Sequence, residues 1–296
     1  MGYKMRLFLI IFNLVFLISC VRLDNMMFSS ATYFDGSYLD YINQKYPDLD
    51  YNYWIEDTID LKKVEEFSYI DKNNNKIFAL YFKQFEDSLT DTLILYFHGN
   101  YFNLLHYIPN IKLLYRLGYD IIAIDYSGYG KSQGEPTEEN LIANIEGIVD
   151  YIIDSLNYKK VAIYGYSLGG FCSVVAEYYL ETKNDSLYFC LIQEAPFSSV
   201  EDLGYTMSRY SFPTYYITNL DLSTKDYIKN IKSKILFIHG KDDNFVSWEN
   251  SRYLYSVAEN SILKDTLFID RADHTSIPTI LGYDNYINIV KGFLFR

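Results

Sequence analysis

The sequence predicts an α/β fold in which a mostly parallel central sheet is covered by helices on both faces. Short, almost continuous apolar runs recur along the chain, as is typical of strands that are buried on both faces. Segments with apolar residues at helical spacing separate these runs, and strands joined by helices form parallel sheets. With 296 residues, of which 49% are hydrophobic, the chain can bury a sizeable core.

The first two expected strands, residues 67–70 and 77–82, flank the polar segment 71–75 and predict a hairpin at one edge of the sheet. The other expected strands are apolar runs at residues 92–97, 120–124, 160–164, 188–192, 234–238 and 266–269. Helices are expected over residues 108–117, 138–156 and 171–181. In open parallel sheets ligands bind beyond the carboxyl ends of the strands, so the residues that follow each strand matter most.

The N-terminus has the features of a bacterial lipoprotein signal. Lys4 and Arg6 precede a short apolar run that ends at Ile18, a pattern typical of a signal peptide rather than a spanning helix. The sequence Leu-Ile-Ser-Cys at residues 17–20 is similar to a lipobox, in which the cysteine is acylated and becomes the new N-terminus. An uncleaved N-terminal anchor or an ordinary signal peptide is the alternative interpretation.

We therefore expect three segments: a lipoprotein signal peptide at 1–19, a tether and N-terminal extension at 20–60, and a folded domain at 61–296. Several acyl chains on Cys20 would hold the protein at a membrane surface, because a single chain binds only marginally. The expected location is extracytoplasmic, at the cell membrane or the outer membrane. The membrane would then be a partner through the lipid anchor.

Composition argues against two other features. The chain has 26 basic and 38 acidic residues, for a formal net charge of −12. Nucleic-acid binding needs Lys and Arg that neutralise phosphates, so no nucleic-acid partner is expected. Cys172 and Cys190 fall in a predicted helix and a predicted strand with apolar neighbours, which favours buried free thiols over a disulfide.

The segment 165–169, Gly-Tyr-Ser-Leu-Gly, lies between a predicted strand and a predicted helix and has the G-x-S-x-G pattern of a nucleophile elbow. A sharp turn there lifts Ser167 clear of the sheet, and Gly165 and Gly169 lack the Cβ atoms that would collide in it. The N-terminus of the following helix places a partial positive charge near the reacting oxygen. Ser167 is therefore the candidate nucleophile.

A serine hydroxyl is a weak nucleophile and requires a base, for which the chain offers four histidines. His274 follows the last expected strand near the C-terminus, the position required by the chain order serine, acid, histidine. His98 and His239 each end a strand and precede a glycine, which suits loop-shaping roles. His106 has no assigned role. His274 is the candidate base.

The acid and the oxyanion hole are expected to follow other strands. Asp242 and Asp243 both follow the strand at 234–238, and either could orient the imidazole. An oxyanion hole needs two backbone N–H groups aimed at the developing negative charge. Leu168, just after the nucleophile, supplies one. Asn100, after the strand at 92–97, is expected to supply the other, with the neighbouring Tyr101 as the alternative.

These separated motifs together resemble the α/β-hydrolase superfamily of serine hydrolases, from about Phe67 to the C-terminus. Residues 125–132, Asp-Tyr-Ser-Gly-Tyr-Gly-Lys-Ser, are similar to its D-x-x-G-x-G-x-S segment. The resemblance implies that Asp243, which matches the family pattern HG-x-x-D-x-x-V, is the triad acid. Residues 97–100 look most like the branch of membrane-associated serine esterases, peptidase-like hydrolases and protein depalmitoylases, although larger residues, Tyr and Phe, follow at 101 and 102.

The resemblance also implies a cap over the pocket, and residues 198–233 form an insertion at the expected place. Its apolar and aromatic residues include Tyr205, Met207, Tyr210, Phe212, Tyr215 and Tyr216. Such a cap favours a substrate with an acyl or otherwise apolar portion. The alternative is that these side chains simply pack on the sheet.

The implied function is a serine hydrolase that cleaves an ester, thioester or amide bond through a Ser-His-Asp triad and an acyl-enzyme. A carboxylesterase or acyl thioesterase acting on a small-molecule or acylated substrate is the first expectation. A serine peptidase of aminopeptidase type is the alternative, with Glu201 and Asp202 as carboxylates for the substrate's ammonium group. A catalytically silent, surface-anchored binding protein is an alternative of another class. The sequence predicts no metal and no cofactor, and it leaves the oligomeric state open.

Overall fold

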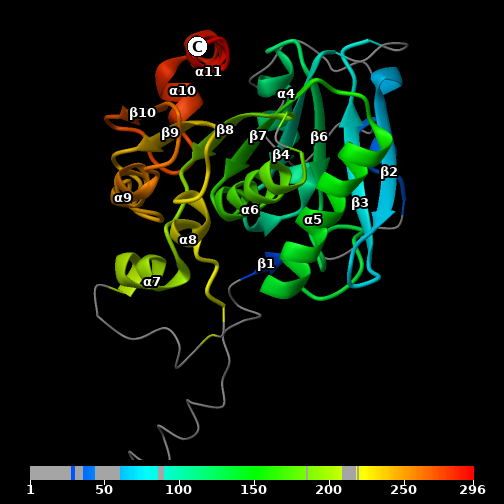
Figure 1. Cartoon of the computed structure of the whole chain (residues 1–296), viewed down its shortest axis with the longest axis horizontal. Coiled ribbons are helices and arrows are strands. Elements are labelled where there is room, and N and C mark those ends of the chain that lie inside the picture. Colours follow the sequence, from blue (N-terminus) through cyan, green and yellow to red (C-terminus); the bar gives the residue numbers. More distant parts are fainter. Residues whose placement is uncertain are drawn as a thin grey trace, which may run out of the picture.

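The computed structural model describes residues 28–30, 36–43, 61–85, 90–184, 186–208, 218 and 220–296. Within these residues an eight-stranded sheet has the strand order β10-β9-β8-β7-β4-β6-β3-β2 (Figure 1). In chain order its strands are β2 (Val64–Ile70), β3 (Lys76–Phe82), β4 (Thr92–Phe97), β6 (Asp120–Ile124), β7 (Lys160–Tyr166), β8 (Tyr188–Glu194), β9 (Lys234–Gly240) and β10 (Lys264–Ile269).

The sheet is parallel except at one edge. Strands β6, β4, β7, β8, β9 and β10 pair in parallel, whereas β3 is antiparallel to both β6 and β2. In the β2–β3 turn, the carboxylate of Asp71 accepts the backbone N–H groups of Asn73 and Asn75. The mostly parallel sheet with an antiparallel edge hairpin is therefore confirmed.

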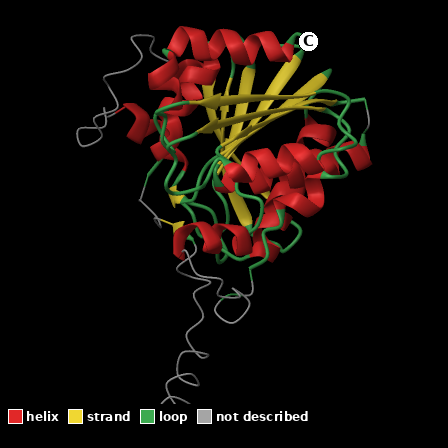
Figure 2. Ribbon diagram, turned by 90° about the vertical axis from the view of Figure 1, so that its left-hand side faces the viewer, coloured by secondary structure: helices red, strands yellow, loops and turns green. Residues whose placement is uncertain are grey.

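Helices cover both faces of the sheet, as Figure 2 shows. Buried side chains of α5 (Glu138–Ser155), α6 (Leu168–Lys183), α8 (Thr224–Ile228) and α9 (Glu249–Val257) share one core cluster. Those of α4 (Ile108–Tyr115), α10 (Ile277–Leu281) and α11 (Tyr283–Leu294) share a second. Along β4, Leu93 and Leu95 belong to the first cluster and Ile94 and Tyr96 to the second, because successive strand residues face opposite sides.

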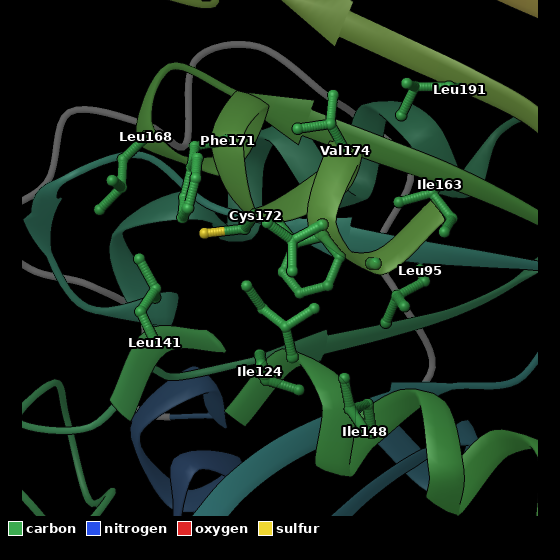
Figure 3. Close-up of a cluster of buried hydrophobic side chains, with 14 of the residues drawn as sticks. Leu95, Ile124, Leu141, Ile148, Ile163, Leu168, Phe171, Cys172, Val174 and Leu191 are labelled. Carbon is green, nitrogen blue, oxygen red and sulfur yellow. The ribbon is translucent and has the colours of Figure 1, made fainter. Parts of the chain in front are cut away.

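The first core cluster fixes helix α6, which follows the elbow. Figure 3 shows its side chains packed together with those of the sheet and of α5. The labelled residues of α6 are Leu168, Phe171, Cys172 and Val174. Cys172 is a buried free thiol, as is Cys190 on β8, so the expectation of two free cysteines is confirmed. Packing on this scale leaves the start of α6 little freedom to move.

Two short N-terminal elements contact the domain far along the chain. Strand β1 (Ser29–Ser30) pairs in parallel with β5 (Tyr101–Phe102), and helix α3 (Tyr38–Asn43) packs against β2. The expected signal peptide and Cys20 lie outside the described residues, so they stay predictions. Among the described residues, no helix is both long enough and apolar enough to cross a membrane.

Candidate active site

The elbow between β7 and α6 holds Ser167 in a strained backbone conformation, with φ 54° and ψ −113°. Such values are rare outside glycine and occur where the surrounding structure enforces them. A Cβ atom on Gly165 would collide with the carbonyl oxygen of Gly169, and one on Gly169 would collide with that of Phe97. The Ser167 N–H donates to the carbonyl oxygen of Glu194 on β8 at 2.9 Å. The turn is therefore tied to strands on both sides.

The loop after β10 brings His274 to Asp243, which follows β9. His274 Nδ1 lies 2.6 Å from Asp243 Oδ2, a short hydrogen bond of the charge-assisted kind. The hydroxyl of Tyr166 donates to the carbonyl oxygen of His274 at 2.9 Å, which ties the loop to the end of β7. Because Nδ1 is engaged, Nε2 is the nitrogen of His274 that is left to accept a proton.

Asp243 is buried and receives four hydrogen bonds. Its Oδ1 accepts the N–H groups of Phe245 and Val246 at 2.9 and 2.8 Å, and its Oδ2 contacts His274 and His239. Burial acts to raise the pKa of Asp243, but the hydrogen bonds from the two histidines outweigh it and hold the pKa below its ordinary value. Asp243 is therefore a stable carboxylate, whereas its neighbour Asp242 is exposed.

His239 supports the acid rather than the reaction. Its ring is fully buried, and Nε2 faces two acceptors, Asp243 Oδ2 at 3.2 Å and the carbonyl oxygen of Val246 at 2.9 Å. A nitrogen between two acceptors carries the proton, so we assign the hydrogen of His239 to Nε2. Nδ1 lies 2.7 Å from the hydroxyl of Ser251, which completes the ring's hydrogen bonds.

A cavity of about 300 Å³ opens beside the elbow and is lined by Ser167, His274, Asn100 and Glu194, among others. The triad candidates from three separate strand ends thus meet at one cavity, which Ser167 and His274 line while Asp243 holds His274 from behind. This is the position at which open parallel sheets bind ligands. Ser167 is 5% exposed and lines this cavity, so the hydroxyl is reached through it.

Of the two residues expected to form the oxyanion hole, Asn100 lines this cavity and Leu168 directly follows Ser167. Leu168 is the first residue of α6, and the N–H of a first helical residue has no partner within its helix. Asn100 lines the cavity, and its side-chain oxygen is held by the hydroxyl of Tyr129 at 2.6 Å. The N–H of Tyr101, the neighbouring alternative, donates to the hydroxyl of Tyr107 at 3.1 Å.

Residues 125–132, which resemble the D-x-x-G-x-G-x-S segment, contact the chain that follows β4, where Asn100 lies. Asp125 is fully buried, and its Oδ1 accepts the N–H of Leu104 at 2.7 Å and lies 3.3 Å from His98 Nε2. Its Oδ2 accepts the hydroxyl of Tyr38 from helix α3. His98 is fully buried and stacks on Tyr107, in agreement with a loop-shaping role.

Sequence reasoning missed several residues of the cavity wall. Glu194 ends β8, which was expected to stop at residue 192, and Ser29 reaches the cavity through the β1–β5 pairing. Phe245 lies in the acid loop, with its ring centroid 5.2 Å from that of His274. The signal for Glu194 was available, because it is a carboxylate that follows an apolar strand run. No local signal pointed to Ser29.

The described part of the insertion at 198–233 lies away from this cavity. Helix α7 (Val200–Ser208) and helix α8 contribute no residue to its lining among those the structure describes. Asp202 is engaged by Ser198, Ser199 and Lys225, and Glu201 is exposed. Neither carboxylate lines the cavity. The side chains of the aromatic cap residues named above lie outside the described residues.

Comparisons with known proteins agree with this architecture. The family described as alpha/beta hydrolase fold matches residues 92–187. Protein bem46 of Schizosaccharomyces pombe is 30% identical over 207 residues, which cover 68% of this chain and 66% of that protein. Protein ABHD12B of Homo sapiens is 30% identical over 60% of this chain and 53% of its own length. Lysophosphatidylserine lipase ABHD12 of Bos taurus is 27% identical over 60% and 48%. The chain thus spans about half to two thirds of these relatives.

Solved structures share the fold at low sequence identity. The esterase Pf2001 of Pyrococcus furiosus superimposes with a TM-score of 0.66 at 18% identity, covering 82% of this chain and 95% of that one. The acylaminoacyl peptidase of Pyrococcus horikoshii gives a TM-score of 0.57 at 17% identity, covering 79% and 41%. The sheet, the elbow and these comparisons together show that the chain has the α/β-hydrolase fold.

Proposed function

We propose that the protein is a serine hydrolase of carboxylic esters or thioesters, with Ser167 as nucleophile, His274 as base and Asp243 as acid. The observation that carries this proposal is the contact of His274 with a stable, buried Asp243 at the cavity that also holds a strained Ser167. Nucleophile, base and orienting acid are the parts that acyl transfer requires.

The proposed reaction has two halves. His274 Nε2 takes the hydroxyl proton of Ser167 as Oγ bonds to the substrate's carbonyl carbon, and the carbonyl oxygen becomes an oxyanion that the N–H groups of Leu168 and Asn100 stabilise. Collapse of this intermediate breaks the bond to the leaving alcohol or thiol, which receives the proton from His274. Water then attacks the acyl-enzyme by the same proton transfers and releases the acid and Ser167.

An acyl substrate suits the chemistry of the cavity wall. Its lining includes the aromatic side chains of Tyr101, Tyr107, Tyr166 and Phe245, and no lysine or arginine among the described residues. A wall of this kind binds an apolar acyl group better than an anionic one. One relative named above is a lysophosphatidylserine lipase, which supports an acyl ester of a lipid as the substrate class.

The substrate class is tested by hydrolysis with the purified full-length chain. We expect turnover of p-nitrophenyl esters and of matched acyl thioesters, little turnover of aminoacyl anilides, and loss of all turnover in Ser167→Ala with an unchanged melting temperature. Faster cleavage of the anilides than of the esters would favour the aminopeptidase alternative. A folded wild-type protein that cleaves none of these substrates would support the silent binding protein.

We also propose that the enzyme works outside the cytoplasm, tethered to a membrane through acylated Cys20. Only eight residues separate Cys20 from Ser29, which lines the cavity, so such a tether would keep the cavity near the bilayer. Tyr101 and Phe102, which pair with β1, are 54% and 42% exposed and give that side an aromatic rim. Aromatic side chains are suited to the membrane interface.

Metabolic labelling tests the location. In a bacterial host given a clickable palmitate analogue, the wild-type chain is expected to carry the label and to sediment with membranes. Cys20→Ala is expected to lose the label. A labelled Cys20→Ala chain, or an unlabelled wild-type chain, would contradict acylation at Cys20 and leave the uncleaved anchor or ordinary signal peptide as the interpretation.

A further inference from the structure

A second carboxylate, that of Glu194, lines the cavity beside Ser167. Glu194 is the last residue of β8, and its carbonyl oxygen accepts the Ser167 N–H at 2.9 Å. Glu194 is 3% exposed and contributes to the same cavity wall as Ser167 and His274. A carboxylate buried to this degree is costly unless something nearby compensates its charge.

The two carboxylate oxygens of Glu194 have different surroundings. Oε2 accepts the hydroxyl of Tyr164 on β7 and, at 3.0 Å, the hydroxyl of Tyr286 on α11. Oε1 makes no hydrogen bond to the described residues. Two donors thus hold the side chain in place from the sheet and from α11, and one oxygen is left without a partner in the wall of the catalytic cavity.

Few groups near Glu194 can carry a positive charge. The titratable groups that face it are Tyr96, Tyr164, Tyr166, Tyr286 and His274. Of these, only His274 can become a cation. The cavity wall holds one other histidine, His106, whose pKa is lowered by burial, and no lysine or arginine among the described residues.

The pKa of Glu194 reflects this balance. Burial raises it above the ordinary value, while the hydroxyl groups of Tyr164 and Tyr286 and the charge of His274 act to lower it. The imidazolium of His274 and the carboxylate of Glu194 therefore stabilise one another. That cation exists during turnover, when His274 has taken the proton of Ser167, and it also faces Asp243 and the ring of Tyr166.

We propose that Glu194 is a positioning residue that stabilises the imidazolium form of His274 across the cavity wall, as a second carboxylate beside Asp243. This inference rests on the proposed function of Ser167 and His274. Glu194 forms no bond to the substrate and exchanges no proton in this role. It supplies negative charge, held by two tyrosine hydroxyl groups, in the wall of the cavity that His274 also lines.

The test compares Glu194→Gln with the wild-type chain in the rate of fluorophosphonate labelling of Ser167 and in kcat/KM on a neutral p-nitrophenyl ester, each from pH 5 to 9. Loss of the negative charge makes His274 easier to deprotonate, so the acid limb of both profiles is expected to move down by about one pH unit. The plateau rate is expected to fall about tenfold, because the imidazolium of the transition state is less stabilised.

Two controls make the result specific. Glu177→Gln replaces another buried carboxyl, on α6 and outside the cavity wall, and is expected to leave both profiles unchanged. Tyr286→Phe removes one donor from Glu194 Oε2 while keeping the carboxyl group, and is expected to shift the acid limb in the same direction by less.

Each other outcome has a definite meaning. A lower plateau with an unmoved acid limb would show that Glu194 is only structural, and unchanged profiles would show that it has no role; either overturns the proposal. A loss confined to the KM of amino-acyl esters would make Glu194 an ammonium-binding residue instead. Failure of the wild-type chain to label at Ser167 would reject the proposed function itself, which is a separate result.

Discussion

At the residue scale, Asp243 is identified as the triad acid by the hydrogen-bond partners of its two carboxylate oxygens. Oδ1 of Asp243 takes the backbone N–H groups of Phe245 and Val246, which fixes the carboxylate, and Oδ2 faces His274 and His239. A carboxylate held in this way selects the imidazole tautomer with its free nitrogen toward the nucleophile. The neighbouring Asp242 points to solvent and makes none of these contacts.

The pair of neighbouring aspartates gives a matched test. Asp243→Asn is expected to lower kcat by about 10³-fold or more, since an amide neither holds the correct tautomer nor stabilises imidazolium. Asp242→Asn is expected to keep the wild-type kcat, because that side chain is exposed. Steady-state kinetics on one ester substrate decide the matter. A large loss in Asp242→Asn with activity kept in Asp243→Asn would exchange their roles.

At the element scale, the strand–turn–helix unit β7–α6 combines strain with close packing. Ser167 adopts a positive φ, and Gly165 and Gly169 meet carbonyl oxygens where a Cβ atom would lie. The rest of α6 is anchored by buried side chains such as Phe171 and Val174. The conformational strain at the nucleophile is therefore maintained by the packing of the helix that follows it.

Alanine substitutions at two glycines test this view of the elbow. Gly165→Ala is expected to destabilise the fold by roughly 1–3 kcal/mol or more, because the new methyl group meets backbone atoms that cannot move freely. Gly292→Ala on α11 is expected to be neutral or to stabilise by about 0.5–1 kcal/mol, since nothing lies within 4 Å of the added Cβ and alanine is the better helix former. Urea unfolding gives the free energy of unfolding of each variant relative to the wild type. Equal changes in the two variants would show that the close contacts at Gly165 do not constrain the turn.

Helix α6 also buries a carboxyl group, that of Glu177. Neither of its oxygens has a hydrogen-bond partner among the described residues. Burial raises its pKa to about 8, although the nearby Ser233 hydroxyl partly offsets this. An acid whose folded-state pKa is raised is stabilised as the neutral form. Its contribution to stability is therefore present at low pH and is lost as the pH rises from the ordinary value of 4.5 toward 8.

Glu177→Gln is expected to abolish the loss of folding stability that ionisation of Glu177 causes as the pH rises. Between pH 5 and pH 8 the wild-type chain should lose up to about 1.4 kcal/mol for each pH unit from this group, whereas the glutamine variant should not. Free energies of unfolding measured at both pH values give the difference between variant and wild type, which should grow with pH. A constant difference would mean that Glu177 is ionised in the folded protein throughout that range.

At the scale of the whole molecule, N-terminal residues complete the architecture from a distance. The hydroxyl of Tyr38 on α3 donates to Asp125, and the N–H of Lys131 donates to that hydroxyl at 2.8 Å. Asp125 in turn accepts the N–H of Leu104, in the segment after β4 that also contains Asn100. A segment that precedes the predicted domain is thus linked to the loop beside the nucleophile.

Tyr38→Phe tests this link. Removing the hydroxyl leaves a buried carboxylate oxygen and a backbone N–H without their partner, which should cost about 1–3 kcal/mol of folding stability. Tyr253→Phe, at a side chain that is 46% exposed, should change stability by less than about 0.5 kcal/mol. Thermal unfolding of the two variants is the measurement, and equal melting temperatures would mean that α3 contributes no stability through Tyr38.

The sequence predicts the strands and the motif residues that follow them, because both depend on residues that are close together along the chain. The apolar runs of β4, β7 and β9 are continuous because both faces of the sheet are covered, and each strand ends in a loop with a motif residue. For that reason Ser167, Asp243 and His274 could be chosen as candidates from the sequence. In the structure Ser167 and His274 line one cavity, and Asp243 contacts His274. The choice between Asp242 and Asp243 needed either the family pattern or the fold.

The features that escaped prediction depend on contacts between distant segments. Ser29 reaches the cavity through pairing with a strand 72 residues away along the chain and through the hydrogen bond that its N–H donates to the side chain of Asn100. Glu194 was missed because the strand was expected to end two residues earlier, and its partner Tyr286 comes from helix α11. That helix was not predicted, although Tyr286, Ile287, Val290 and Phe293 are apolar at helical spacing and are buried in the structure.

Covalent labelling is the direct test of whether Ser167 is an activated nucleophile. The full-length chain is treated with a fluorophosphonate and the modified peptide is located by mass spectrometry. We expect one adduct on Ser167, no adduct in Ser167→Ala, and much slower labelling in Asp243→Asn with both variants folded. A folded wild-type chain that carries no adduct, or carries it on another residue, would show that Ser167 is not an activated nucleophile.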